Sequence, residues 1–302
     1  KALTTGSGNV MIGYLCGDAI QDGASNTLMG RHAGGSLTSQ DNNTLLGWYC
    51  GDGITGSGNT AIGVNALGHA ANADVDDAVA VGRNALASAD SSHDDGAVAV
   101  GTFALEAFES TDADNGSVAI GWGAGTSGTT GLRDAVFVGY KAGYTNNNSS
   151  NTMIGYKAGT LITGTENVVL GYGAGITGVD VDACVIIGKD AAAGQLAAGA
   201  DYTVAIGRSA LGALTTGGGN TAIGYNACTN VTTGTGNTGI GNRALEDCAT
   251  DGGGSNVGHN NTCIGSQSGM NITYGIGNVT IGETCASVYT HADANIIIGA
   301  NS

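Results

Sequence analysis

Short apolar blocks recur along the whole chain, and each of them ends at a glycine. In every block the residue before the glycine is aliphatic, and the residue three positions before it is β-branched. The blocks follow one another about every 18 residues, a spacing typical of repeat proteins. The seventeen anchor glycines are Gly13, Gly30, Gly47, Gly63, Gly82, Gly101, Gly121, Gly139, Gly155, Gly171, Gly188, Gly207, Gly224, Gly241, Gly265, Gly282 and Gly299.

Each block predicts one short strand followed by a turn, so that one repeat forms one coil stacked on its neighbours. We therefore predict an all-β chain, a parallel β-roll or β-solenoid of about 17 coils, with residues 1–302 forming a single repeat array. The longest gap between anchors follows Gly241 and predicts a loop insertion at about residues 246–260.

The two regular positions of each block lie two residues apart, so in a strand they point to the same face. We expect them to line the interior of the coils. The predicted structural core is Ile12, Leu46, Ile62, Ile120, Ile154, Ile187, Ile206, Ile223, Ile240, Ile264, Ile281 and Ile298. The residue between them is also apolar in nearly every block, as at Met11 and Phe137. A strand that is apolar on both faces is covered on both faces, which predicts an oligomer.

Two further positions repeat with the anchor. The third residue after it is always small, which predicts a tight inward corner, and the cysteines Cys16, Cys50 and Cys285 occupy this slot as structural thiols. Unpaired cysteines favour assembly in a reducing cytosol. The fourth residue before the anchor is Asn in eleven copies, which suits the turn entering each strand and a ladder of stacked side chains.

Composition narrows the function classes. The chain has 56 glycines, no proline and a net charge of −16, so phosphate-mediated binding of nucleic acid is excluded. No apolar run reaches the roughly 18 residues that span a bilayer, so no membrane insertion is expected. Gly234-Thr-Gly-Asn-Thr-Gly239 matches a dinucleotide-binding pattern, but no helix is expected to follow it, so the repeat itself explains the match.

Two groups of side chains are candidates for ligand binding. The position after the anchor predicts an aromatic surface stripe, with basic residues beside it, for stacking on a glycan, although bridges between neighbouring subunits or pairing with the acidic turns explain it better. This stripe consists of Tyr14, Trp48, Trp122, Tyr140, Tyr156, Tyr172 and Tyr225. Oxygen-rich turns offer weak calcium candidates, for which solvated turns are the better explanation. These candidates are Asp74, Asp76, Asp77, Asp94 and Asp95. We expect no other cofactor and no catalytic site.

The segments Ser117-Val-Ala-Ile-Gly121 and Gly58-Asn-Thr-Ala-Ile-Gly63 resemble two kinds of repeat. The first is similar to the head repeats of trimeric autotransporter adhesins (the YadA-like family), and the second to β-roll repeats of phage tail fibres. The resemblance implies a left-handed β-roll, three chains around one axis, and host attachment. Repeats here are longer than the shorter autotransporter repeat, and no stalk or anchor is present. We expect a section of a longer protein, or ends that dock onto partner proteins.

The function expected from these features is that of a structural and adhesive fibre segment, not an enzyme. The leading hypothesis is a homotrimeric phage tail-fibre shaft or receptor-binding region on the virion surface. Its partners would be flanking fibre or baseplate proteins and a host glycan or protein receptor. The alternative is a bacterial adhesin head on the extracellular cell surface. A third hypothesis, a glycan hydrolase built on a solenoid, is disfavoured because the sequence shows no carboxylate pair within an aromatic cleft.

Overall fold

The computed structural model describes residues 5–68, 74–88, 95–107, 116–126, 132–146, 148–248, 258–288 and 293–302. Within these residues all regular structure is strand, and no helix could cross a membrane. The chain divides into two compact units, Lys1–Asn151 and Thr152–Ser302, and the same repeat continues through both. Of the loop expected at 246–260, residues 249–257 lie outside the described part.

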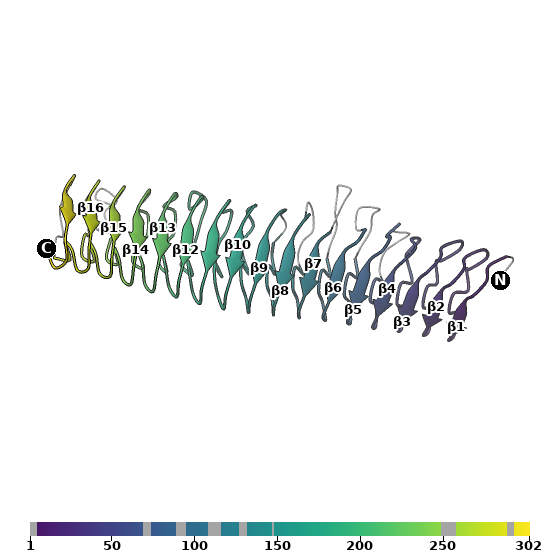
Figure 1. The fold of residues 1–302 in the computed structure, drawn as a ribbon. Coiled ribbons are helices and arrows are strands. Elements are labelled where there is room, and N and C mark those ends of the chain that lie inside the picture. The colour runs from purple at the N-terminus through teal and green to yellow at the C-terminus, as the bar shows by residue number, and fades with distance from the viewer. Residues whose placement is uncertain are drawn as a thin grey trace. The chain divides into compact units, whose positions relative to one another are not determined.

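Each unit is a parallel β-solenoid in which every coil contributes one three-residue strand (Figure 1). In the first unit the strands are β1 (Val10–Ile12), β2 (Thr27–Met29), β3 (Thr44–Leu46), β4 (Thr60–Ile62), β5 (Val79–Val81), β6 (Val98–Val100), β7 (Val118–Ile120) and β8 (Val136–Val138). In the second unit they are β9 (Thr152–Ile154), β10 (Val168–Leu170), β11 (Val185–Ile187), β12 (Val204–Ile206), β13 (Thr221–Ile223), β14 (Thr238–Ile240), β15 (Thr262–Ile264), β16 (Val279–Ile281) and β17 (Ile296–Ile298).

The strands occupy the three positions that precede each anchor glycine, as the sequence predicts. Consecutive strands pair in parallel and in register, so equivalent residues stack in columns. Between β2 and β3, for example, Leu28 lies opposite Leu45 and Met29 lies opposite Leu46. The predicted parallel solenoid is therefore confirmed in each unit.

The anchor position requires glycine for two reasons. At Gly224 the backbone φ is +139°, a conformation that L side chains rarely adopt. A Cβ atom at this position would also lie 2.3 Å from the carbonyl oxygen of Gly241, the anchor of the next coil. The close approach follows from in-register stacking, since the Gly241 N–H donates to the carbonyl of Ile223 one coil earlier.

The asparagine ladder expected from the sequence is present. Asn43 is buried, and its backbone N–H donates to the side-chain oxygen of Asn26 in the preceding coil. The Asn59 N–H donates to the Asn43 side chain in the same way. The side-chain amide of Asn26 meanwhile donates to the carbonyl of Gln40. These bonds satisfy polar groups that would otherwise be costly to bury, and they hold neighbouring coils in register.

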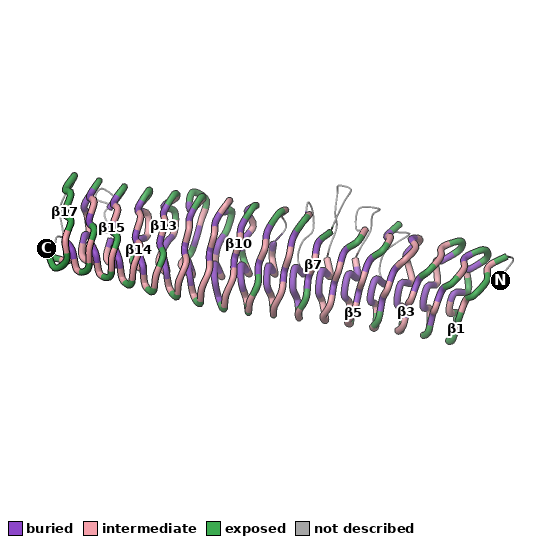
Figure 2. The backbone as a smooth tube through the Cα atoms, in the orientation of Figure 1, coloured by how far each residue is buried: buried purple, intermediate pink, exposed green. Residues whose placement is uncertain are grey.

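The interior of the coils is formed by the middle residue of each strand, and the core predicted from the sequence was wrong. In β12 the central Ala205 is fully buried, whereas Ile206 is only half-buried. Figure 2 shows the buried residues as an inner strip along the coils of each unit. The misassigned residues, half-buried or exposed on the outer face, are Ile12, Leu46, Ile62, Ile120, Ile154, Ile187, Ile206, Ile223, Ile240, Ile264, Ile281 and Ile298. Because both faces are apolar, alternation alone could not identify the inner one.

In most coils two columns fill the interior together. Where the middle strand residue is large, the fourth residue after the anchor is usually glycine, as at Leu45 and Gly51. A Cβ atom on Gly51 would lie 2.6 Å from Leu45 Cδ1. Where the middle residue is small, the fourth residue after the anchor is usually large, as at Ala61 and Leu67, which are both fully buried. The coil of β7 differs, because Ala119 and Gly125 are both small and side chains of the neighbouring coils approach Gly125 instead. This exchange of volume identifies the inward-facing column, because protein interiors are close-packed.

Candidate binding surface

The outer face of the strands is a largely apolar surface in the single chain. It consists of two columns, the first and the third strand residues. The third residue is Ile, Val, Leu or Met in every strand, whereas the first is Val or Ile in ten strands and Thr in seven. Ile62 is 43% exposed and Ile120 is 42% exposed. We call these two columns the outer strand face. Contiguous apolar surfaces of this kind on soluble proteins usually mark an interaction site.

The seven predicted stripe residues follow the anchor glycines, next to the outer strand face. All seven are exposed, from 39% at Tyr140 to 67% at Tyr14. The structure brings some of them together within each unit. Trp122 and Tyr140 stack at 5.2 Å between ring centroids, and Tyr156 and Tyr172 stack at 4.9 Å.

Basic side chains at the same edge lie over these rings. Lys189 Nζ lies 5.5 Å from the centroid of Tyr172, and the Arg208 guanidinium lies 5.8 Å from that of Tyr225. Cation–π contacts of this kind contribute about 0.5–1 kcal/mol each at exposed sites. They link one coil to the next along the edge, and they explain why basic residues gather there in an acidic protein.

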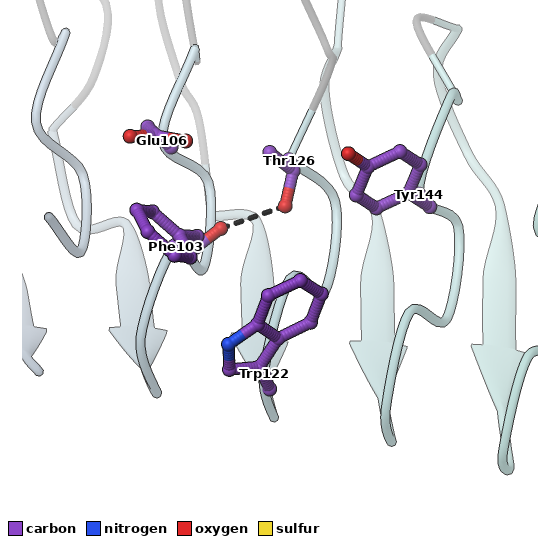
Figure 3. Close-up of a pocket in the computed structure, with 5 residues that line it drawn as sticks. All are labelled: Phe103, Glu106, Trp122, Thr126 and Tyr144. Carbon is purple, nitrogen blue, oxygen red and sulfur yellow. Dashed lines mark hydrogen bonds between the residues drawn. The ribbon is translucent and has the colours of Figure 1, made fainter. Parts of the chain in front are cut away.

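A small cleft opens on this edge in the first unit (Figure 3). Its volume is about 160 Å³, and it is lined by Phe103, Glu106, Trp122, Thr126 and Tyr144. These residues come from the turns that follow β6, β7 and β8, so three successive coils build the cleft. Of the lining residues only Trp122 was singled out from the sequence. The others were missed because their role depends on the stacking of turns, which the repeat pattern does not specify.

The rings of the cleft hold one another in place. Phe103 and Trp122 form an edge-to-face pair, with centroids 5.7 Å apart and ring planes at 87°. Lys141 Nζ lies 4.6 Å from the centroid of Tyr144 and 5.3 Å from that of Trp122. Glu106 Oε1 accepts a hydrogen bond of 2.9 Å from Asn84 Nδ2. The aromatic wall and the carboxylate are therefore positioned before any ligand arrives.

Aspartates in the turns form hydrogen bonds that hold successive coils in register. The Asp76 backbone N–H donates to Asp95 Oδ1 at 2.8 Å, and the Ser57 N–H donates to Asp76 Oδ1 at 2.5 Å. Burial and the nearby carboxylates, Asp76 first, raise the pKa of Asp95. Within the described residues no three His, Cys, Asp or Glu side chains are grouped to hold a metal ion. Of the calcium candidates, Asp94 lies outside the described residues.

The cysteines are free thiols, and all except Cys16 are buried. Burial raises the pKa of Cys50 to about 12 and that of Cys184 to about 11. Thiols of this kind remain protonated near neutral pH and are poor nucleophiles. Cys50 and Cys285 fill the small corner position, as the sequence predicts.

Comparison with known proteins gives no indication of function. No family model matches the chain, and no curated protein or solved structure matches it.

Proposed function

We propose that the chain is a structural and adhesive fibre segment that works as a homotrimer, with the outer strand faces of three copies turned toward one another. The observation that carries this proposal is the outer strand face itself, on which an apolar third strand residue repeats in every coil. Covering such a surface is favourable by about 25 cal/mol for each Å² of apolar area removed from water.

A second copy of the chain is the partner that fits this surface best. Two identical chains running in the same direction present the same columns at the same spacing of about 4.8 Å, so side chains of one copy meet those of the next coil by coil. Identical subunits arranged around one axis form a closed assembly in which each chain is covered in the same way. Three copies and a left-handed winding are what the resemblance to trimeric adhesins and tail fibres implies.

An assembly of this kind presents identical side chains in threefold repetition on its outer surface. Weak contacts with a host surface then add through avidity, which exceeds the affinity of a single site by orders of magnitude. We favour a phage tail fibre, because six buried free thiols suit a chain that assembles in a reducing compartment. Attachment to a host surface is thus the proposed function.

Neighbouring positions of β12 test the proposal. Ile206→Asp places a charge on the outer strand face, so we expect the native mass to fall from three chains to one while the β-sheet circular dichroism signal is retained. Ala205→Asp places the charge in the interior and should prevent folding. Tyr202 is 73% exposed and lies in the turn before β12, outside the outer strand face, so Tyr202→Asp is the matched control and should remain trimeric.

The same proteins test attachment. Each is labelled, and the amount that remains bound after washing is measured on a panel of bacterial and animal cells. The trimeric wild type and the Tyr202→Asp control should be retained on the host cells far more strongly than the Ile206→Asp variant. A trimeric Ile206→Asp protein would refute the proposed interface. Equal retention of single chains and trimers would refute attachment through avidity.

A further inference from the structure

The cleft beside Trp122 has the properties of a site for one small ring. Its volume of about 160 Å³ is below the roughly 300–1,000 Å³ of sites for drug-sized molecules. Its lining combines three aromatic rings, among them a tyrosine phenol and a tryptophan indole, with one carboxylate and one threonine hydroxyl. A ligand that fits must therefore offer an apolar surface to the rings and polar groups to the remaining wall.

Two polar groups of the cleft, on Glu106 and Thr126, are placed to accept hydrogen bonds from a ligand. Glu106 uses Oε1 to accept from Asn84, which leaves Oε2 for a ligand hydroxyl. The Thr126 hydroxyl donates its proton to the Phe103 carbonyl at 2.7 Å, so it meets a ligand as an acceptor (Figure 3). A ligand with several hydroxyl groups satisfies this arrangement, because each hydroxyl brings a proton to donate.

Charges of both signs border the cleft, so an ion of either sign meets a like charge there. A quaternary ammonium group is the usual ligand of an aromatic cage, but the Lys141 ammonium already lies over Tyr144 and Trp122. A second cation in the cleft would be repelled by it. An anion would meet the Glu106 carboxylate and a chain of net charge −16. The cleft therefore fits an uncharged ligand.

We propose that this cleft binds a single neutral pyranose residue of a surface glycan, with the C–H face of the sugar against Trp122 and its hydroxyls on Glu106 and Thr126. The inference rests on the proposed function, since it names the chemical class to which the fibre attaches. Among the lining residues that the structure describes, Glu106 is the one carboxylate. Glycoside hydrolysis ordinarily needs two carboxylates, so we assign these described residues to binding of the sugar.

The chain has two tryptophans, which makes Trp122 a convenient reporter. In the Trp48→Phe variant Trp122 is the sole tryptophan, and its fluorescence is recorded during titration with glucose, galactose, mannose or N-acetylglucosamine. We expect a saturable change with at least one sugar, at a Kd of about 1–10 mM for a single residue. The converse variant, Trp122→Phe, should give no saturable signal from Trp48.

Glu106→Gln tests the carboxylate without changing its size, and the Kd should rise about tenfold on loss of a charge-assisted hydrogen bond. Glu283→Gln, in the second unit, is the matched control and should leave the Kd unchanged. The native mass and circular dichroism spectrum of each variant are measured first, so that a misfolded protein is not scored.

Three results would overturn the proposal: no saturable response to any of the four sugars up to about 100 mM, an unchanged Kd in Glu106→Gln, or tighter binding of tetramethylammonium or N-acetylneuraminate. Failure of the site is distinguishable from failure of the proposed function. A trimeric protein that does not respond to sugars refutes sugar binding at the cleft and is consistent with the proposed fibre. A single-chain protein that responds to sugars refutes the proposed trimer and is consistent with sugar binding at the cleft.

Discussion

Exchange of side-chain volume between two columns of the interior leads to a quantitative prediction. In the coil of β3 the interior holds Leu45 beside Gly51, and in the next coil it holds Ala61 beside Leu67. Replacing Leu45 by Ala and Gly51 by Leu together converts the first pattern into the second. In the double variant the coil of β3 has the same pair, alanine and leucine, that the coil of β4 has in the wild type. The chain therefore acquires no pair of interior residues that it does not already contain.

Each single change should be costly. Leu45 is fully buried, so Leu45→Ala leaves a cavity and should cost about 3 kcal/mol. At Gly51 φ is +59°, which costs a leucine roughly 1–2 kcal/mol. A Cβ atom there would also lie 2.6 Å from Leu45 Cδ1, and such overpacking adds about 1–3 kcal/mol. Gly51→Leu should therefore also cost about 3 kcal/mol.

The double variant should be much more stable than the sum of the single variants. The leucine at 51 would fill the cavity left at 45, and only the backbone cost of about 1–2 kcal/mol should remain. Leu67 already adopts this conformation, with φ of +52°. We therefore expect a coupling energy of about 4 kcal/mol between the two sites.

Native-state hydrogen exchange of the backbone amides of β3 and its neighbours measures this coupling, since it reports local stability in a repeat array. A coupling energy near zero would show that the two side chains do not share one interior space. The assignment of the middle strand residue to the interior would then be wrong.

Three further predictions test single features of the fold. Gly224→Ala should destabilise the second unit by more than about 4 kcal/mol in urea unfolding, because of its φ and the 2.3 Å approach to the next anchor, whereas Gly219→Ala, with no described atom within 4 Å of the added Cβ, should cost only about 1 kcal/mol. Asp95→Asn keeps the acceptor for the neighbouring N–H and removes the charge. The pKa of Asp95 in the folded protein lies above the ordinary value of 3.8, so the wild-type protein should lose stability as the pH rises from 3.8 through that raised pKa. The Asp95→Asn variant should therefore have a higher melting temperature than the wild type at pH 7 but not at pH 3. Cys50 and Cys248, with pKa values of about 12, should resist iodoacetamide at pH 8 until urea unfolds the chain, and rapid labelling of the native protein would contradict their burial.

The sequence was sufficient to predict where the strands lie. The anchor glycine, the aliphatic residue before it and the β-branched residue three positions before it recur in every copy, and every strand of the described residues ends at the residue before an anchor. The asparagine ladder and the small corner residues were also predicted, because each position admits few residue types for a steric or hydrogen-bonding reason.

Alternation of residue types could not predict which face of the strands points into the interior. Alternation favours the regular column of Ile, Val and Leu as the core. The buried column is instead the variable one, whose side chains range in size from glycine at Gly239 to phenylalanine at Phe137. Its variability was the informative signal. In most coils, residues in this column change size together with the fourth residue after the anchor, as positions that share an enclosed space do.

The cleft was beyond the reach of the sequence for a different reason. Phe103, Glu106 and Tyr144 occupy turn positions that hold many residue types in other coils, so no repeat pattern marks them. They become neighbours because in-register stacking places turns of successive coils side by side. Trp122 was found from the sequence because its position carries aromatic residues repeatedly.

The mass of the native assembly is the decisive measurement, because the proposed trimer requires the outer strand face to be covered by identical chains. Native mass spectrometry of the unmodified protein should give three times the mass of one chain, and the value should persist on dilution to nanomolar concentration. A protein that remains soluble as a single chain, with its outer strand face open to water, would refute the proposed trimer.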